Sequence, residues 1–208
     1  MSDYQMVNLY RLILQSLPDS TCRMIEVISA QPGEGVSTIV HFLAEAAASV
    51  ANARVLICDA TARPDNFRYL AAPSTSACCL REITSEKPDL SKAVQRVPSS
   101  GFSLTHVAKQ GTEGEAAMNI DRLDSALMLL RQKFDLILID AGATSQGPLG
   151  LAMAKKADRV LLVIEADRTR TPVAAAALRA IEVSGGHLLG AVLNKRRFRI
   201  PRLIYRWL

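Results

Sequence analysis

The stretch Ser29-Ala-Gln-Pro-Gly-Glu-Gly-Val-Ser-Thr38 decides the fold of this chain. It lies between an apolar, strand-like run and a helical pattern that begins at Val36. Glycines at such a junction let backbone N–H groups turn inward and hold an anion, aided by the helix N-terminus. The phosphate-loop pattern G-x-x-x-x-G-K-[ST], in which alanine can take the first position, is matched by Ala30, Gly35 and Ser37. The spacing predicts a phosphate-binding loop between a strand and a helix.

One position departs from this pattern, because Val36 stands where the pattern has lysine. That lysine normally reaches the β- and γ-phosphates and neutralises charge during transfer. Valine carries no charge, so the loop argues more strongly for the fold than for activity. The amide cradle can still bind phosphate, and the Ser37 hydroxyl can still ligate Mg²⁺. The residues expected to contact a nucleotide in this loop are Gly33, Glu34, Gly35, Val36, Ser37 and Thr38.

Strand-like apolar runs alternate with helical patterns along the whole chain, which predicts an α/β fold with a mostly parallel central sheet and helices on both faces. The predicted strands are 24–29, 54–59, 102–107, 134–140, 159–165 and 188–194. The predicted helices are 4–17, 36–50, one within 77–97, 113–132 and 172–183. A length of 208 residues favours one domain. We expect it to cover 1–198, including the N-terminal helix, with 199–208 as a tail.

Positive charge is concentrated at the C-terminus. The net charge is +5, and the last fourteen residues carry six cations and no acid, which leaves the rest of the chain near −1. The high isoelectric point is therefore a property of the tail, and no nucleic-acid-binding surface is expected over the domain. No run of about 18 apolar residues and no signal-peptide pattern occurs, so we expect a cytoplasmic protein.

The tail has its own helical pattern, with one apolar stripe beside arginines. The stripe consists of Ile200, Leu203, Ile204, Trp207 and Leu208. A basic amphipathic end of this kind can lie on an anionic membrane surface or fill a partner's groove. The same periodicity fits a segment that packs against the domain's own sheet, and the sequence leaves both alternatives open.

The cysteines and histidines give no sign of a metal or redox site. The four cysteines lack metal-ligand spacing, which predicts free thiols in a reducing compartment. The three histidines, His41, His106 and His187, are scattered and have no visible partner in the sequence, so each is expected to be structural.

Two aspartates end apolar strands. Asp59 and Asp140 would both lie at the carboxyl edge of the sheet, where ligands bind in open α/β folds. A strand-ending aspartate can equally cap a helix, and Asn194, which ends the last predicted strand, can be a simple turn residue.

The chain resembles the bacterial tyrosine kinases of capsule and exopolysaccharide synthesis, which are related to the MinD/ParA-type ATPases. The segments that carry the resemblance are ISAQPGEGVSTIVHFLAEAAAS (28–49), RVLICDATARPD (54–65), FDLILIDAGA (134–143), ADRVLLVIEADRTR (157–170) and LLGAVLNKRR (188–197). They follow the family's order and cover nearly the whole chain. The resemblance implies that Asp59 and Asp140 are the catalytic acids, here vestigial. It implies that they bind Mg²⁺ together with Ser37, and that Asn194 lies near the base of ATP or ADP.

The chain also departs from this family at positions that serve catalysis. Besides Val36, Thr61 stands where the second motif has its second aspartate, and Ala143 replaces a proline after Asp140. The subunit-contact motif E-x-x-R-x-x-R of the first helix corresponds to Asn8, Arg11 and Leu14, and the C-terminal tyrosine cluster is reduced to Tyr205. These losses predict weak or absent nucleotide binding and impaired catalysis.

The resemblance implies a kinase-like accessory or regulatory protein of exopolysaccharide biosynthesis and export, associated peripherally with the inner membrane. Its expected partner is a membrane co-polymerase that regulates chain length, or another protein of the export machinery. A first alternative is an active ATP-dependent tyrosine autokinase in which another lysine, the nearest to a motif being Lys195, replaces the missing one. A second is a MinD/ParA-like positioning ATPase, which is disfavoured because 29–35 contain no signature lysine.

Overall fold

The computed structural model describes residues 3–17, 22–61, 79–83, 90–98, 100–109 and 111–196. Its strands are β1 (Arg23–Ser29), β2 (Val55–Asp59), β3 (Gln95–Arg96), β4 (Phe102–His106), β5 (Leu136–Ala143), β6 (Arg159–Glu165) and β7 (Leu188–Asn194). Its α-helices are α1 (Asp3–Gln15), α2 (Val36–Val50), α3 (Glu113–Met118), α4 (Asp124–Lys133), α5 (Pro148–Ala154) and α6 (Thr171–Val183). Short 3₁₀ helices cover Leu80–Glu82, Leu90–Lys92 and Ile120–Leu123. The predicted tail, 199–208, lies outside the described residues, as do Arg63, Cys78 and Tyr205.

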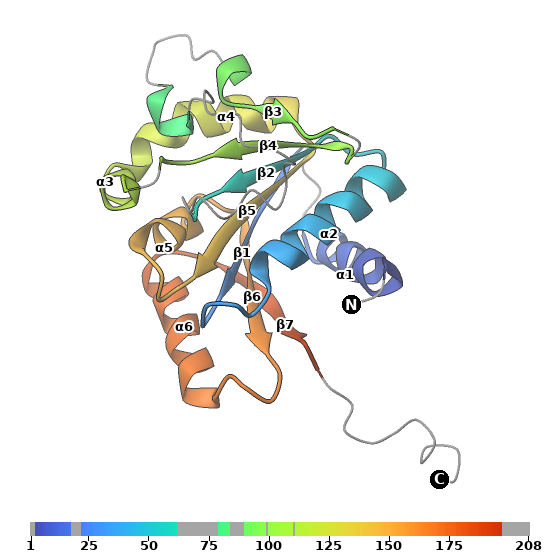
Figure 1. Cartoon of the computed structure of the whole chain (residues 1–208), viewed down its shortest axis with the longest axis vertical. Helices are drawn as coiled ribbons and strands as arrows, with labels where there is room; N and C mark the ends of the chain where they lie inside the picture. The colour runs from blue at the N-terminus through green and yellow to red at the C-terminus, as the bar shows by residue number, and fades with distance from the viewer. Residues whose placement is uncertain are drawn as a thin grey trace.

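The strands form one seven-stranded sheet in the order β3-β4-β2-β5-β1-β6-β7. Every neighbouring pair is parallel except β3 and β4, which are antiparallel. The central strands are apolar runs because both of their faces are covered, and in β2 every position is buried. The carboxyl ends of the parallel strands therefore meet along one edge of the sheet, and α2 begins there (Figure 1).

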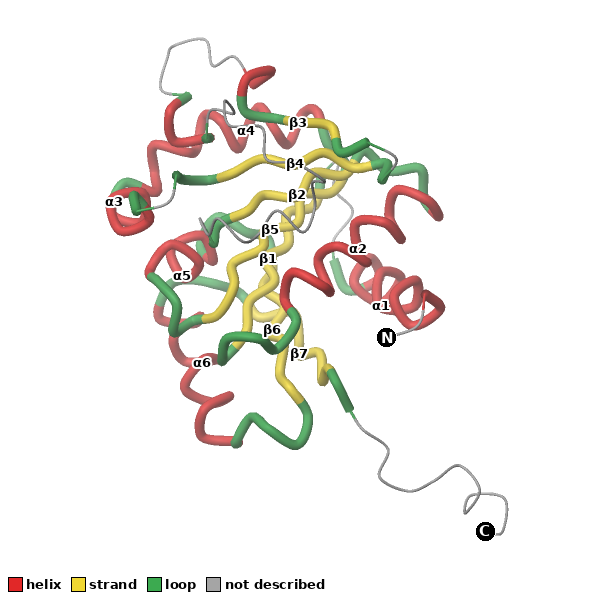
Figure 2. The backbone as a smooth tube through the Cα atoms, viewed as in Figure 1, coloured by secondary structure: helices red, strands yellow, loops and turns green. Residues whose placement is uncertain are grey.

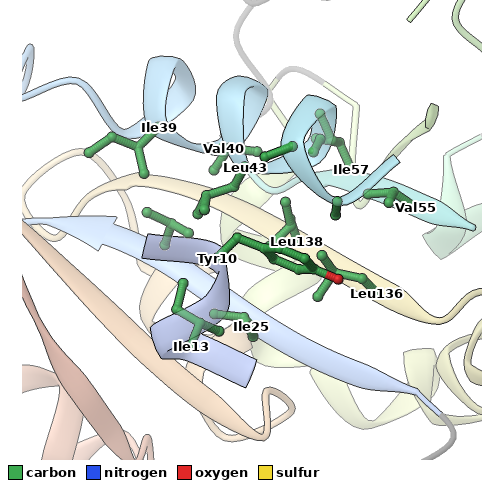
Figure 3. Close-up of a cluster of buried hydrophobic side chains, with 14 of the residues drawn as sticks. Tyr10, Ile13, Ile25, Ile39, Val40, Leu43, Val55, Ile57, Leu136 and Leu138 are labelled. Atoms are coloured by element: carbon green, nitrogen blue, oxygen red, sulfur yellow. The ribbon is translucent and has the colours of Figure 1, made fainter. Parts of the chain in front are cut away.

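Helices cover both faces of the sheet, as predicted (Figures 1 and 2). On one face α1 packs on α2, and both lie over a core cluster that includes Tyr10, Ile13, Leu43, Ile25 and Leu138 (Figure 3). The opposite face lies under α3 to α6 and has two further buried clusters. Burial of this apolar surface stabilises the sheet, and the sheet in turn positions the phosphate loop.

Three sequence predictions need correction. The single helix predicted within 77–97 is wrong for the residues described there, because they form two 3₁₀ turns and the short strand β3. The helix predicted over 113–132 is divided into α3, a 3₁₀ turn and α4. The break falls at Asn119, whose side-chain Nδ2 donates to the Glu115 carbonyl and so competes with the helix backbone. Helix α5 was not predicted, because its seven residues include Pro148 and Gly150 and give little periodicity.

One buried side chain breaks the apolar pattern of the central strand. Glu26 lies in the middle of β1, beside Ile139 of β5 and Val160 of β6. Its side chain is fully buried, and neither carboxyl oxygen has a hydrogen-bond partner among the described residues. Burial raises the pKa of this carboxyl well above its ordinary value, because the charged form loses its hydration.

Candidate phosphate-binding site

The loop between β1 and α2 lines a cavity of about 430 Å³ at the carboxyl edge of the sheet. The remaining walls come from the ends of β2, β5 and β7. The lining residues are Ser29, Pro32, Gly33, Glu34, Gly35, Val36, Ser37, Thr38, Thr61, Gly142, Ala143, Gln146 and Lys195. All six loop residues predicted from the sequence to contact a nucleotide therefore lie at one cavity, and their contact with a nucleotide stays a prediction.

The loop has the backbone geometry of an anion cradle. Gly33 and Gly35 have φ angles of 82° and 102°, in the left-handed region that favours glycine. Gly35 is also the N-cap of α2, so the positive end of that helix opens toward the cavity. A Cβ atom on Gly35 would lie 2.3 Å from Asn194 Nδ2, which excludes any other residue at this position without a rearrangement.

Glu34 braces the loop from within the protein. Its side chain is fully buried, and its carboxylate accepts hydrogen bonds from Gln31 N (2.9 Å), from Glu165 N (3.2 Å) and from the Thr169 hydroxyl. These donors tie the loop to the end of β6 and the start of the following turn. The Glu34 carboxylate is thus committed to holding the loop in place.

Asn194 supports the same loop from the end of β7. Its Nδ2 donates to the Glu34 carbonyl at 2.8 Å, and its side chain is buried. Asn194 is thus more than a turn residue, because it fixes the height of the loop above the sheet. It is not among the described residues that line the cavity, and a contact with the base of a nucleotide stays a prediction.

Val36 occupies the lysine position without offering a polar group. It is the first residue of α2, it is 5% exposed, and it packs into the core cluster beneath α1 and α2. It also forms part of the cavity wall. The cradle therefore meets an aliphatic surface at the position from which a lysine would reach the phosphates.

The structure brings Asp59 and Asp140 side by side, since they are register partners on β2 and β5. Both side chains are buried, and neither is among the described residues that line the cavity. Asp59 Oδ1 accepts two hydrogen bonds from Thr61, from N at 2.8 Å and from Oγ1 at 2.7 Å. Asp140 Oδ1 accepts one from Gly142 N at 3.3 Å. Thr61 thus replaces an acid and also holds the remaining acid beneath the cavity floor.

His106 lies beside these two acids, and the structure gives it a neighbour that the sequence did not show. It ends β4 as the register partner of Asp59, and its Nδ1 lies 3.4 Å from Asp59 Oδ2. That oxygen is buried and has no hydrogen-bond partner among the described residues. The signal in the sequence was a histidine at the end of a predicted strand, but its meaning required the order of the strands.

Lys195, which the sequence offered as the lysine nearest to a motif, makes contacts that the sequence could not show. It follows β7 with a left-handed φ of 56°, and its Nζ donates to the Gly33 carbonyl at 2.5 Å. The same Nζ lies 3.2 Å from Glu165 Oε2, which also pairs with Arg168 at 2.9 Å. The hydrogen bond from Arg168, and then that from Lys195, lower the pKa of the Glu165 carboxyl. Among the described residues that line the cavity, Lys195 has the only cationic side chain.

The loop and Ser37 suit Mg²⁺ and a nucleotide better than the two aspartates do. The glycine cradle and the Ser37 hydroxyl lie at the cavity and suit phosphate and Mg²⁺. The buried oxygen Asp59 Oδ2 lacks a hydrogen bond but faces His106, and Oδ1 is taken by Thr61. In the described part of the chain, no group of three or more His, Cys, Asp or Glu side chains could hold a metal ion. The set therefore fits a metal bound mainly through phosphate and Ser37.

Comparison with known proteins places this site in a family context. No family model matches the chain. It is 29% identical over 189 residues to the succinoglycan biosynthesis transport protein ExoP of Rhizobium meliloti (strain 1021), covering 87% of this chain and 23% of that protein. It is 27% identical over 172 residues to an uncharacterised ATP-binding protein of Methanocaldococcus jannaschii, covering 83% of this chain and 64% of that one. The chain thus spans less than two thirds of either relative.

Solved structures agree with these sequence matches. The BceF tyrosine kinase domain is 25% identical, with a TM-score of 0.73 and coverage of 92% of this chain and 76% of that one. The kinase domain of the Escherichia coli tyrosine kinase ETK is 20% identical, with a TM-score of 0.79 and coverage of 94% and 77%.

The chain has the fold of a P-loop α/β domain. It is similar to the bacterial tyrosine kinase domain BceF and to part of the transport protein ExoP, which agrees with the resemblance and the fold class predicted from the sequence. It lacks the lysine of the phosphate loop. In the described part of the chain, no helix is long and apolar enough to cross a membrane.

Proposed function

We propose that the chain is a kinase-like accessory protein of exopolysaccharide biosynthesis and export that binds nucleotide weakly and transfers phosphate poorly. The observation that carries this proposal is that the buried, uncharged Val36 forms part of the cavity wall beside an otherwise intact cradle. A cradle without a positive charge at this position stabilises a bound phosphate through backbone N–H groups. It stabilises the negative charge that develops during phosphate transfer less well.

Each site residue has a defined part in this proposal. The backbone around Gly33 and Gly35 holds the phosphate groups, and Ser37 Oγ contributes to the coordination of Mg²⁺. Bound Mg²⁺ would supply charge neutralisation. Asp59 and Asp140 are buried and are not among the described residues that line the cavity, so their contribution to holding such an ion would be indirect. For the same reason, the Asp59 carboxylate is poorly placed to act as a base on a substrate hydroxyl.

The biological setting is proposed from the relatives. The printed name of the Rhizobium protein is that of a succinoglycan biosynthesis transport protein, and this chain matches 23% of its length. We propose that this chain works beside a membrane co-polymerase or another export protein at the inner face of the membrane. The basic tail, 199–208, offers a contact with such a partner or with anionic lipid.

An active autokinase remains the second candidate, and one observation favours it. Lys195 reaches the loop from β7, so the cavity has a cation although the loop does not. Against transfer stand Thr61 in place of an acid and the reduction of the tyrosine cluster to Tyr205.

Phosphotransfer by the purified protein tests the proposal. We expect little or no incorporation of labelled phosphate into the protein from ATP with Mg²⁺. Robust incorporation that is abolished by Asp59→Ala and Asp140→Ala would establish the autokinase instead. In the source organism, deletion of the gene should alter polymer length or amount, and the Asp59→Ala/Asp140→Ala double variant should restore it. Failure of that variant to complement, if the purified variant keeps the melting temperature of wild type, would show that catalysis is required.

A further inference from the structure

We propose that Lys195 supplies the positive charge that the loop lost at Val36, and that its ammonium group contacts the phosphate groups of a bound nucleotide. The proposal rests on the nucleotide binding proposed above and adds the residue that makes such binding favourable. It assigns a phosphate-binding role to a lysine outside the loop.

The position of Lys195 is the first argument. β7 ends at the same edge of the sheet as β1, and Lys195 follows it directly. Its Nζ already touches the phosphate loop, because it donates to the Gly33 carbonyl at 2.5 Å. Gly33 is one of the two left-handed glycines of the cradle, so the ammonium group lies beside the backbone that would hold phosphate.

The partners of Lys195 make it available for a ligand. A carbonyl and a shared carboxylate are weaker partners for an ammonium group than a phosphate with two or more negative charges. Arg168 pairs with Glu165 at 2.9 Å, so that carboxylate keeps a partner when Lys195 turns toward a ligand. The Lys195 side chain is 44% exposed, and its movement therefore disrupts no core packing.

Three other lysines are engaged in ion pairs away from the cavity. Lys109 pairs with Glu82 at 2.6 Å, and Lys155 and Lys156 both pair with Asp121. None of them is among the described residues that line the cavity. Lys133 ends α4, at the opposite edge of the sheet from the cavity, and is exposed, which makes it a suitable control.

The test is a titration of the full chain with ATP and, separately, with adenosine at fixed Mg²⁺. The variants are Lys195→Met, Lys195→Arg, the matched control Lys133→Met, and Val36→Lys. We expect Lys195→Met to weaken ATP binding about tenfold. This value is at the lower end of what a charge-assisted contact contributes to affinity, because solvent partly screens the ammonium group. Lys195→Arg should retain most of the affinity, and Lys133→Met should match wild type. Adenosine binding should be unchanged in all of them.

The outcomes separate this proposal from the proposed function. If Lys195→Met, with an unchanged melting temperature, binds ATP as wild type does, Lys195 has no phosphate role although nucleotide binding stands. If it loses ATP and adenosine equally, Lys195 shapes the loop and does not contact phosphate. If only Val36→Lys binds ATP, the cavity is a phosphate site that Lys195 does not complete. If no variant binds ATP, the proposed nucleotide binding and the role of Lys195 both fail.

Discussion

Substitution of Val36 by lysine should raise affinity for ATP·Mg²⁺. The new ammonium group would enter a cavity of about 430 Å³ whose cradle and Ser37 are already in place. A charge-assisted contact to phosphate contributes about 1.5–3 kcal/mol, which corresponds to about one to two decades in affinity. Lys195 already brings one positive charge to this cavity, and the two cations would repel each other. We therefore expect a gain in ATP affinity at the lower end of this range, about tenfold.

The same substitution should cost stability. Val36 is 5% exposed and packs in the core beneath α1 and α2, and a lysine whose stem turns to the cavity removes part of that packing. Loss of a buried methyl group costs about 1 kcal/mol, so the free energy of unfolding should fall by about that amount. Turnover should recover less than binding, because Thr61 still stands in place of the second acid.

The assay is isothermal calorimetry of wild type, Val36→Lys and Val36→Met with ATP at fixed Mg²⁺, beside chemical denaturation of each. Val36→Met separates side-chain length from charge and should bind ATP no better than wild type. Equal gains from methionine and lysine would refute the charge argument. Equal and unmeasurable binding in all three proteins would mean that the cavity does not accept phosphate.

Three further predictions concern the frame of the site and the tail. Glu26→Leu should raise the free energy of unfolding by about 1–3 kcal/mol at pH 8, because it removes a buried polar group without a partner. Burial raises the pKa of Glu26 in the folded state, so the folded protein binds one proton more than the unfolded chain at pH values between the two pKa values. The free energy of unfolding of wild type should therefore fall as pH rises from about 4.5. Denaturation curves measured across pH should show no such loss for Glu26→Leu. Asn194→Ala removes the hydrogen-bond donor to the Glu34 carbonyl, so it should lower the free energy of unfolding by about 1–3 kcal/mol and weaken ATP binding. If thermal unfolding and calorimetry show unchanged stability and unchanged ATP affinity, Asn194 does not support the loop. Deletion of 201–208 should reduce sedimentation with anionic vesicles or co-purification with the export partner, whereas unchanged association would mean that the tail does not dock there.

The framework of the sheet could be predicted from the sequence for a clear physical reason. Strands covered on both faces are continuous apolar runs, and β6 matches its predicted range, 159–165. The edge strand β7 also matches its predicted range, 188–194, because it is apolar along its length, although Leu188 and Leu193 are exposed. The phosphate loop could be predicted equally well, because its glycines and their spacing follow from a local turn and from the start of α2. The short elements α5 and β3 escaped prediction, since seven and two residues carry too little periodicity.

The interactions across the site could not be predicted, because they depend on strand order and on backbone conformation. His106 meets Asp59 only because β4 lies next to β2. Lys195 reaches Gly33 only because β7 closes the edge beside β6 and the chain then takes a left-handed turn. The Glu34 carboxylate likewise binds donors more than 130 positions away, and no local pattern announces such a contact.

One measurement tests the central claim, namely that this site binds nucleotide without transferring phosphate. Excess protein is mixed with a trace of ATP labelled at the γ-phosphate in the presence of Mg²⁺, and the bound fraction and its chemical form are determined in the same sample over time. The account predicts that ATP is retained and recovered unchanged, with no label on protein. It is contradicted if no ATP is retained, or if the label passes to water or to tyrosine at a rate that Asp140→Ala abolishes.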